Sequence, residues 1–186
     1  MAINGANKTN NKTKKYNTMN GTYHFLRIKG NYRDLIVYKK AVCIFDITYY
    51  FAHTYLEYGD RTMDQMIQAA RSGKQNIAEG SSASDTSSET DLKLINVSRA
   101  SFQELLNYYE EYLRVRGKEV WAVSSEKAVQ TRRVCSWHNE TSFYRERIDK
   151  RSDETVANIA ITMIRQEDVL LRKLIASIQE ELLSEG

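Results

Sequence analysis

The stretch DLIVYKKAVCIFDITYYFAHTYL, residues 34–56, decides the fold class of this chain. Within it, apolar side chains recur every three or four positions without a break. They are Leu35, Tyr38, Val42, Phe45, Tyr49, Ala52 and Leu56. This spacing is typical of one face of an α-helix that packs nearly parallel to other helices. Four more apolar residues widen that surface, namely Ile36, Ile44, Ile47 and Phe51. The pattern predicts a helix that is central in its bundle or is also buried in an oligomer.

Three further segments have the same spacing, which predicts four long helices at about residues 33–58, 61–79, 88–116 and 153–183. The chain has 186 residues and no proline, and this favours long uninterrupted helices. The first two connections are short and the third is long. This order is typical of an antiparallel up-down-up-down four-helix bundle, so we expect residues 32–186 to form one all-α domain of that kind.

Small residues and capping residues mark the second of these helices. Asp60 or Thr62 is expected to cap its first turn. Gly80 is expected to end it as a left-handed cap. Gly73 costs about 1 kcal/mol relative to alanine inside a helix. Its presence among the small side chains of residues 69–73 therefore predicts a close approach between two helices.

The charge of the chain is unevenly distributed. Residues 1–31 carry six Lys/Arg and no Asp/Glu, although the net charge of the whole chain is only +3. Their glycines and asparagines favour a disordered or loosely attached basic tail. A tail of this composition serves nucleic-acid binding, an acidic membrane surface or only solubility, and the sequence leaves all three open.

Several features favour a cytoplasmic protein without a membrane partner. The N-terminal residues contain no apolar core of the kind found in a signal peptide. The most apolar stretch, residues 42–52, contains Asp46 and is too short to span a bilayer. Cys43 and Cys135 form no metal-binding or redox motif, and we expect free thiols in a reducing compartment.

The connection at residues 118–152 is long for a compact bundle, which makes it a candidate for function or for decoration of the bundle. Aromatic residues alternate there with basic ones, and residues 117–151 hold eight Lys/Arg against five Asp/Glu. A short helix is expected near residues 125–134, and the rest of this insert is expected to be irregular.

The sequence contains none of the motifs that indicate a catalytic or metal site. A di-iron bundle needs Glu-x-x-His pairs, and no glutamate here has a histidine three residues later. The three histidines, His24, His53 and His138, are scattered. A Gly-x-Ser-x-Gly elbow and a glycine-rich phosphate loop are both absent. We therefore expect no enzymatic activity, no metal and no cofactor.

One polar cluster is expected between the second and third helices. Asn76 and Glu79 are three residues apart and share a helix face, and Arg99 and Glu104 lie on the next helix. These four residues predict a buried polar network that fixes the register of the two helices. The alternative is a polar ligand-binding pocket.

Three motifs carry a resemblance to a known family. They are YRDLIVYKKA (residues 32–41), QMIQAARSGKQNIAEG (residues 65–80) and ASFQEL (residues 100–105). In their order and spacing the chain resembles the bacterial four-helix bundle proteins encoded in intervening sequences of large-subunit ribosomal RNA genes, formerly labelled S23-like ribosomal proteins. The sequence NIAEG at residues 76–80 is the most distinctive part.

This resemblance implies an antiparallel four-helix bundle that assembles as a ring-like homopentamer without enzymatic activity. A related family, the accessory variability protein of diversity-generating retroelements, uses a basic ring to bind a reverse transcriptase and nucleic acid. Many relatives have a proline where this chain has Lys74, so its second helix is expected to continue without a kink.

Our first functional hypothesis is an oligomeric scaffold that binds RNA through charge, with RNA or a reverse transcriptase as partner. Phosphate contacts give affinity that depends on salt and tolerates many sequences. Trp137 or Tyr144 is expected to stack on unpaired bases. The opposing interpretation is that the basic residues are merely solvated and the aromatic residues pack the insert onto the bundle. The basic residues expected to bind are Lys8, Lys12, Lys14, Lys15, Arg132, Arg133, Lys150 and Arg151.

The second hypothesis is a protein–protein adaptor that binds no nucleic acid. The first helix is very apolar, and the third carries Tyr108, Tyr109 and Tyr112. Together these helices offer more hydrophobic surface than one bundle core needs. Self-association alone is the competing use of this surface.

Overall fold

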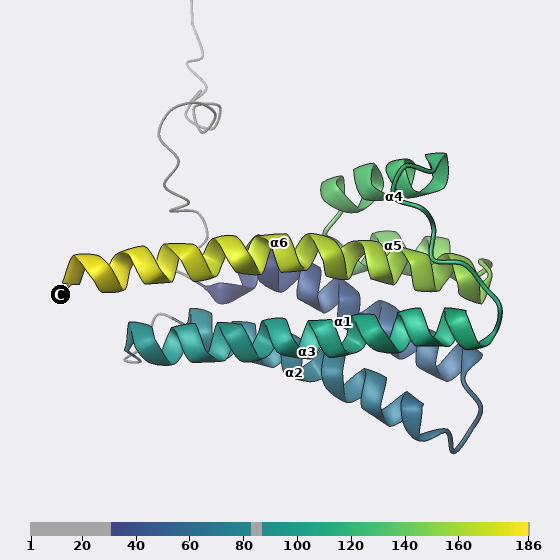
Figure 1. Ribbon diagram of the computed structural model, residues 1–186, viewed down its shortest axis with the longest axis horizontal. Coiled ribbons are helices and arrows are strands. Elements are labelled where there is room, and N and C mark those ends of the chain that lie inside the picture. Colours follow the sequence, from purple (N-terminus) through teal and green to yellow (C-terminus); the bar gives the residue numbers. More distant parts are fainter. Residues whose placement is uncertain (1–30, 83–86, 186) are drawn as a thin grey trace, which may run out of the picture.

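The computed structural model describes residues 31–82 and 87–185, which contain six α-helices and no strand (Figure 1). The predicted all-α class is therefore confirmed. The predicted basic tail, residues 1–31, lies outside the described residues except for Asn31. The elements are η2 (Tyr32–Asp34, a 3-10 helix), α1 (Ile36–Tyr55), α2 (Arg61–Ser81), α3 (Ser88–Val115), α4 (Glu126–Trp137), α5 (Thr141–Ile148) and α6 (Asp153–Glu185).

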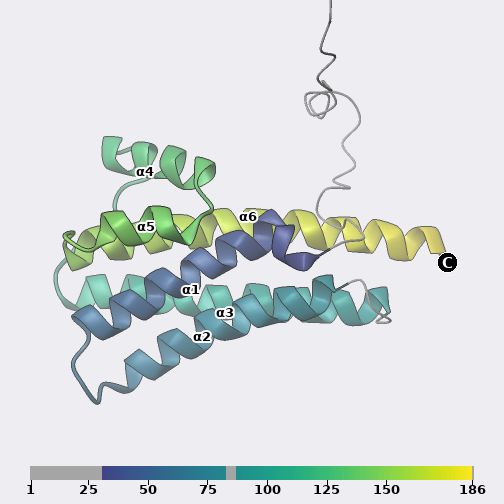
Figure 2. The same cartoon turned by 180° about the vertical axis from the view of Figure 1, so that it is seen from behind.

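The four long helices α1, α2, α3 and α6 lie side by side (Figures 1 and 2). Helix α1 packs on α2 and α6, and α3 also packs on α2 and α6. Followed along the chain, α1 and α3 run in one direction and α2 and α6 run in the other (Figure 1). Apolar faces that repeat every three to four residues are thus buried between antiparallel neighbours.

Hydrogen bonds at the helix ends explain where the helices begin. The Asp60 carboxylate accepts from the Thr62 backbone N–H at 2.8 Å, so Asp60 is the cap of α2. The Ser152 hydroxyl accepts from the Thr155 N–H at 3.2 Å before α6. These contacts satisfy backbone donors that have no partner inside the helix. Gly117, with φ +64°, follows α3 in the left-handed region that a glycine adopts without strain.

The predicted close approach at Gly73 is confirmed, whereas Gly80 plays a different part from the predicted one. A Cβ atom on Gly73 would lie 2.6 Å from the Phe102 ring of α3. Gly80 does not end α2 in a left-handed conformation, because the helix continues to Ser81. Instead, a Cβ on Gly80 would lie 3.0 Å from the Leu94 Cβ. Both glycines therefore allow α2 and α3 to approach closely.

The face of α1 that is buried differs from the predicted one. Val37 and Ile44 are fully buried, whereas Tyr49 of the predicted face is 49% exposed. Helix α1 is rotated so that its Thr48 hydroxyl accepts a 2.9 Å hydrogen bond from the buried Tyr109 hydroxyl. The broad apolar surface of α1 allows more than one of its sides to be buried. Exposure of Tyr49 is tolerated because the hydroxyl of a tyrosine remains hydrated.

The insert forms a separate layer on the outside of the long helices (Figures 1 and 2). Helix α4 packs on α6 and α5 packs on α1. The helix expected near residues 125–134 is present as α4, but the expectation that the rest is irregular is wrong because α5 follows it. The fold of α5 depends on Tyr144 and Ile148, two buried residues one helical turn apart.

Candidate nucleic-acid interface

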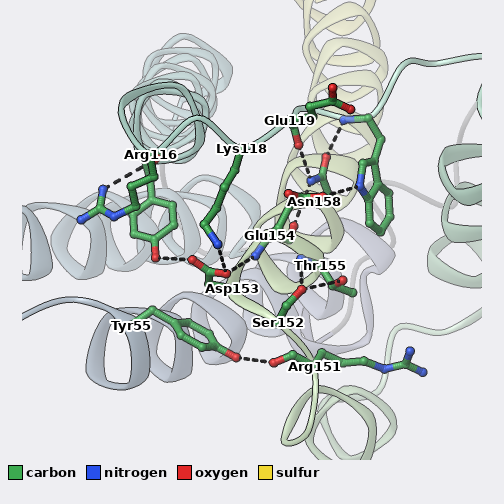
Figure 3. Close-up of polar contacts among 12 residues, drawn as sticks. Tyr55, Arg116, Lys118, Glu119, Arg151, Ser152, Asp153, Glu154, Thr155 and Asn158 are labelled. Atoms are coloured by element: carbon green, nitrogen blue, oxygen red, sulfur yellow. Dashed lines mark hydrogen bonds and ion pairs between the residues drawn. The ribbon is translucent and has the colours of Figure 1, made fainter.

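The insert leaves α3 and returns to α6 at a tight polar cluster (Figure 3). The Lys118 ammonium donates to the Asp153 carboxylate at 2.7 Å, and the Tyr112 hydroxyl donates to the same carboxylate at 2.7 Å. Burial alone would raise the pKa of Asp153, but the hydrogen bonds from Lys118, Tyr112 and the Glu154 N–H lower it. Asp153 is therefore a charged anchor for the first residues of the insert.

Asn158 of α6 positions Trp121 next to this anchor. The Trp121 backbone N–H donates to the Asn158 side-chain oxygen at 2.8 Å. The Asn158 amide donates in turn to the Glu119 carbonyl at 2.9 Å, and the Trp121 indole N–H faces a Glu154 carboxylate oxygen at 3.4 Å (Figure 3). These contacts hold the loop before α4 in one conformation.

A buried lysine holds the end of α4 on the long helices. Lys40 of α1 is 2% exposed, and its ammonium donates to the Cys135 carbonyl at 2.7 Å and to the Gln166 side chain at 3.2 Å. Gln166 also donates to the Arg132 carbonyl at 2.9 Å. Burial lowers the pKa of Lys40. A cation suits this place because carbonyl groups at a helix C-terminus carry partial negative charge.

The side chains of α5 separate into three rows at four-residue spacing. Tyr144 and Ile148 form the buried row, and the Tyr144 hydroxyl donates to the His138 carbonyl at 2.6 Å. Phe143 and Arg147 lie toward α4, and Arg145 lies toward α1. Because residues four apart share one side of a helix, α5 forms a wall of two different grooves.

The groove on the α4 side is the basic groove, with a volume of about 520 Å³. Its lining includes three cations, Lys127, Arg147 and Arg151, and no carboxylate. Hydroxyl and amide groups add neutral donors. A cavity with this lining suits an anionic ligand such as a phosphate diester. The groove is lined by Trp121, Lys127, Gln130, Thr131, Val134, Cys135, Phe143, Tyr144, Arg147, Ile148, Arg151, Thr155 and Ile159.

The two aromatic rings on the open side of the basic groove differ in their surroundings. The Phe143 ring is stacked with His138 at 3.6 Å between centroids, and the Arg147 guanidinium lies 3.9 Å from the same ring. Trp121 has the Lys127 ammonium 5.7 Å from its ring. Cation–π contacts such as these preorganise the charged groups over the rings. Phe143 is covered by a stacked ring and a close guanidinium, whereas the ammonium near Trp121 is more distant, so Trp121 is the ring more accessible to a flat ligand.

A second feature of the insert is the outer stripe of α4, formed by Val129, Arg133 and Trp137. These three residues are four apart and exposed, and the Trp137 side chain is 79% exposed. The arrangement offers an aromatic face and a cation on one helix side. Base–aromatic stacking and phosphate contacts in single-strand recognition use the same two elements.

The groove on the α1 side of α5 is the acidic groove, with a volume of about 700 Å³. Three carboxylates, one arginine and one histidine contribute to its walls, together with several aromatic rings. It therefore has the opposite charge preference from the basic groove. It is lined by Cys43, Phe45, Asp46, Ile47, Tyr49, Tyr50, His53, Thr54, Thr141, Tyr144, Arg145, Glu146, Ile148 and Asp149.

The structure places the predicted phosphate ligands in different surroundings. Arg151 lines the basic groove, and Arg133 and Lys150 are exposed on the insert. Arg132 instead donates to the Val123 carbonyl at 2.7 Å and lines a smaller pocket of about 240 Å³. The other predicted ligands, Lys8, Lys12, Lys14 and Lys15, lie outside the described residues.

Of the two aromatic residues predicted to stack on bases, Trp137 is exposed and Tyr144 is not. Tyr144 is 3% exposed, and its ring faces the interior because α5 needs an apolar anchor. Sequence reasoning missed Lys127 and Arg147 as members of a site. The spacing of Phe143, Arg147 and Arg151 by four residues was the available signal for a shared helix side.

The predicted network of Asn76, Glu79, Arg99 and Glu104 does not form, because each side chain bonds elsewhere. Asn76 donates to the Ser72 carbonyl at 2.8 Å within α2. Arg99 pairs with Asp168 of α6 at 2.7 Å. Glu79 accepts from Gln75, and Glu104 accepts from Tyr108, both at positions four residues away. Asn76 bonds within its own helix, and the longer side chains of Arg99, Glu79 and Glu104 reach solvent or another helix more easily than one another.

A smaller set of hydroxyl groups joins α2 and α3 in its place. Ser98 of α3 donates to the Gly73 carbonyl at 2.8 Å, and the Ser72 and Ser101 hydroxyls lie 3.0 Å apart. Short side chains suit this interface because Gly73 brings the two backbones close together. The register of α2 and α3 is therefore fixed by serines.

Within the part of the chain that the structure describes, no group of three or more His, Cys, Asp or Glu side chains is arranged to hold a metal ion. Among those same residues, no helix combines the length and the apolar character that crossing a membrane requires. Cys43 and Cys135 are free thiols and are buried, and burial raises the pKa of Cys43 to about 12.

No family model, no curated protein and no solved structure matches the chain. The resemblance to the intervening-sequence proteins therefore stays a prediction from three motifs.

Proposed function

We propose that this protein is a non-enzymatic, oligomeric four-helix bundle that binds RNA through the surface of its 118–152 insert. The observation that carries the proposal is the basic groove, whose lining contains three cations and no carboxylate. Each phosphate neutralised by Lys or Arg releases counterions, so affinity falls steeply as salt rises. The binding that we expect is dependent on salt and tolerant of sequence.

Single-stranded or looped RNA is the expected form of the ligand. A groove of about 520 Å³ has the size of a small-molecule site, and it admits one nucleotide unit more easily than a rigid duplex. Trp121 in the groove and Trp137 on the outer stripe of α4 offer rings on which unpaired bases stack. Duplex RNA hides its bases and offers such rings little.

The scaffold itself is proposed to be the antiparallel four-helix bundle of α1, α2, α3 and α6, with the basic N-terminal tail as an additional phosphate ligand. Self-association is supported by the family resemblance, which implies a pentamer. Buried free thiols suit the reducing cytoplasm. A reverse transcriptase is the protein partner that the resemblance implies.

The test is fluorescence anisotropy with a labelled stem-loop RNA over a range of salt concentrations. The variant Lys127→Gln/Arg147→Gln/Arg151→Gln is expected to reduce the slope of log Kd against log salt by about 2, because three phosphate contacts are lost. The matched control is Lys39→Gln/Arg61→Gln/Lys93→Gln, which removes three exposed cations outside the groove. Failure of the wild-type protein to bind RNA even at low salt would rule the proposal out.

A protein–protein adaptor is the second candidate, and the outer stripe of α4 is the observation that favours it. Val129 and Trp137 are exposed apolar side chains on one side of a helix, and such surfaces serve protein partners as well as bases. The tyrosines of α3 support this candidate less, since Tyr109 and Tyr112 are buried. Co-purification of an unrelated protein that is lost in Trp137→Ala, with no RNA bound, would favour the adaptor.

A further inference from the structure

The acidic groove has a charge that the proposed RNA-binding function does not use. Asp46, Glu146 and Asp149 contribute carboxylates to its lining, and Arg145 is its only Lys or Arg. Arg145 lies 3.9 Å from Asp46, which is too long for a strong ion pair. Glu146 also lies 3.5 Å from Arg147, which belongs to the basic groove. The walls of the acidic groove themselves hold three carboxylates against one arginine and so retain a net negative charge.

The same groove has aromatic walls suited to a cation. Phe45, Tyr49 and Tyr50 line it, and Tyr49 is about half exposed. At the edge of this wall the Lys74 ammonium already lies 4.4 Å from the Phe45 ring. Ammonium groups over aromatic faces are stabilised by the ring electrons. Further lysines on the neighbouring rings would gain the same contact.

Partial burial of Asp46 favours a second cation beside its carboxylate. Burial raises the pKa of this carboxyl, and Arg145 and Lys74 lower it only in part. A second cation close to a half-buried carboxylate compensates for its lost hydration. Asp46 therefore favours a positively charged occupant over an uncharged one.

We propose that the acidic groove holds the N-terminal segment of the same chain, residues 1–30. That segment contains six Lys/Arg and no Asp/Glu, and it also contains Tyr16, Tyr23 and Phe25. Its composition complements both the carboxylates and the aromatic walls of the groove. The basic groove of the insert has no part in this contact, but a tail held in the acidic groove has to leave it before its lysines contact RNA phosphates.

The length of the segment allows this contact. The groove residues on α1, from Cys43 to Thr54, lie about 10–27 Å from Ile36 along the helix at 1.5 Å per residue. Lys15 is connected to Asn31 by a chain that spans at most about 53 Å. The segment thus reaches the whole groove, and its attachment to the same molecule gives an effective concentration in the millimolar range.

Carbodiimide cross-linking of the full-length protein tests the contact, because it joins lysine amines directly to nearby carboxylates. After digestion and mass spectrometry, Lys8, Lys12, Lys14 and Lys15 are expected to be linked mainly to the groove carboxylates, within one molecule. Mixing isotopically light and heavy protein separates links within a molecule from links between molecules. Links that connect two molecules, or links spread evenly over exposed carboxylates such as Glu57 and Glu111, would overturn the proposal.

Trypsin cleavage after Lys12 to Lys15 provides the second measurement. The variant Asp46→Asn/Glu146→Gln/Asp149→Asn is expected to accelerate this cleavage by at least about threefold, since three surface ion pairs of modest strength are lost. The matched control, Glu57→Gln/Glu89→Gln/Glu111→Gln, removes exposed carboxylates outside the groove and is expected to leave the rate unchanged. Equal cleavage rates in the wild-type protein and both variants would contradict the proposal.

Discussion

The two grooves beside α5 share a wall and have opposite charge. Tyr144 and Ile148 line both of them. On the α4 side, Phe143, Arg147 and Arg151 face the basic groove, whereas on the α1 side Arg145 is outnumbered by carboxylates. One helix of eight residues therefore separates two grooves of opposite charge. The difference arises from four-residue spacing along α5 and from the neighbours that each side meets.

This comparison explains why overall charge says little about the insert. Residues 117–151 have a small excess of positive charge, and a uniform surface would be only weakly basic. The fold sorts those charges, so that the charged side chains lining one groove are all cations and those lining the other are mainly carboxylates. Local separation of charge gives stronger fields than the net value suggests.

The largest effect on stability is expected from removal of the Tyr144 ring, which lines both grooves. Tyr144→Ala deletes a buried ring and is expected to reduce the free energy of unfolding by about 3–5 kcal/mol. Urea denaturation followed by circular dichroism measures this loss. Tyr144→Phe keeps the ring and loses only the bond to the His138 carbonyl, with an expected cost of about 1 kcal/mol. Equal costs for the two variants would show that the ring is not the anchor of α5.

Removing the cations of the basic groove and removing the carboxylates of the acidic groove are expected to affect RNA binding in different ways. Lys127→Gln/Arg147→Gln/Arg151→Gln is expected to weaken RNA affinity by about ten- to a hundredfold at low salt. Asp46→Asn/Glu146→Gln/Asp149→Asn is expected to leave affinity unchanged or to strengthen it slightly. Anisotropy titrations of both variants with the same RNA give the result. The distinction between the grooves fails if both variants lose affinity equally.

The long helices beneath α4 carry two buried ionisable side chains, Lys40 and Glu167. Both Glu167 carboxyl oxygens are buried without a hydrogen-bond partner among the described residues, and burial raises the pKa of this group well above 4.5. The folded protein thus binds more protons than the unfolded chain above about pH 4.5. The free energy of unfolding is expected to fall as pH rises from 4.5 through the folded pKa of Glu167.

Substitution of Glu167 tests this dependence. Glu167→Leu is expected to raise the free energy of unfolding by about 1–3 kcal/mol near pH 8 and by less near pH 5. Urea denaturation at several pH values measures both differences. The exposed Glu180→Leu on the same helix serves as control, with an expected change within about 0.5 kcal/mol. A pH-independent gain in Glu167→Leu would show that ionisation of this carboxyl is not the cause.

The smallest effect is expected at the outer stripe of α4. Trp137→Ala removes an exposed ring and is expected to leave stability within about 0.5 kcal/mol. If Trp137 stacks on a base, RNA affinity falls by about fivefold or more. Anisotropy with single-stranded and duplex RNA measures the change, and Val129→Ala is the neighbouring control. Loss of affinity for duplex alone would contradict stacking.

The long helices were predictable because their signals are local. The apolar spacing that places the four long helices and the cap at Asp60 each depend on a few neighbouring residues, and the structure agrees with both. The close approach at Gly73 was also predictable, because a glycine inside a helix is costly without such a reason. The buried face of α1 was not predictable, since nearly every side of that helix is apolar.

The candidate site was predictable only in its general location. The excess of arginine and aromatic residues pointed to the insert, but the basic groove depends on α4, α5 and α6 meeting in space. Arg132 and Arg147 are both arginines of the insert, and the local sequence does not predict that their contacts differ. One bonds to the Val123 carbonyl and the other lies over Phe143, and this difference follows from tertiary packing alone. Nothing in the local spacing predicted that Lys40 would anchor α4.

The ion pair between Lys118 and Asp153 joins the points at which the chain leaves α3 and enters α6. The 34 residues between them thus form a closed excursion that starts and finishes at one corner of the protein. The exposed positions of this excursion are free to change while the four long helices keep their course, provided that the buried Tyr144 and Ile148 and the Lys40 contact to Cys135 remain. A chain built in this way gains new surface chemistry at the exposed positions of one segment, and the helices that carry it keep their packing.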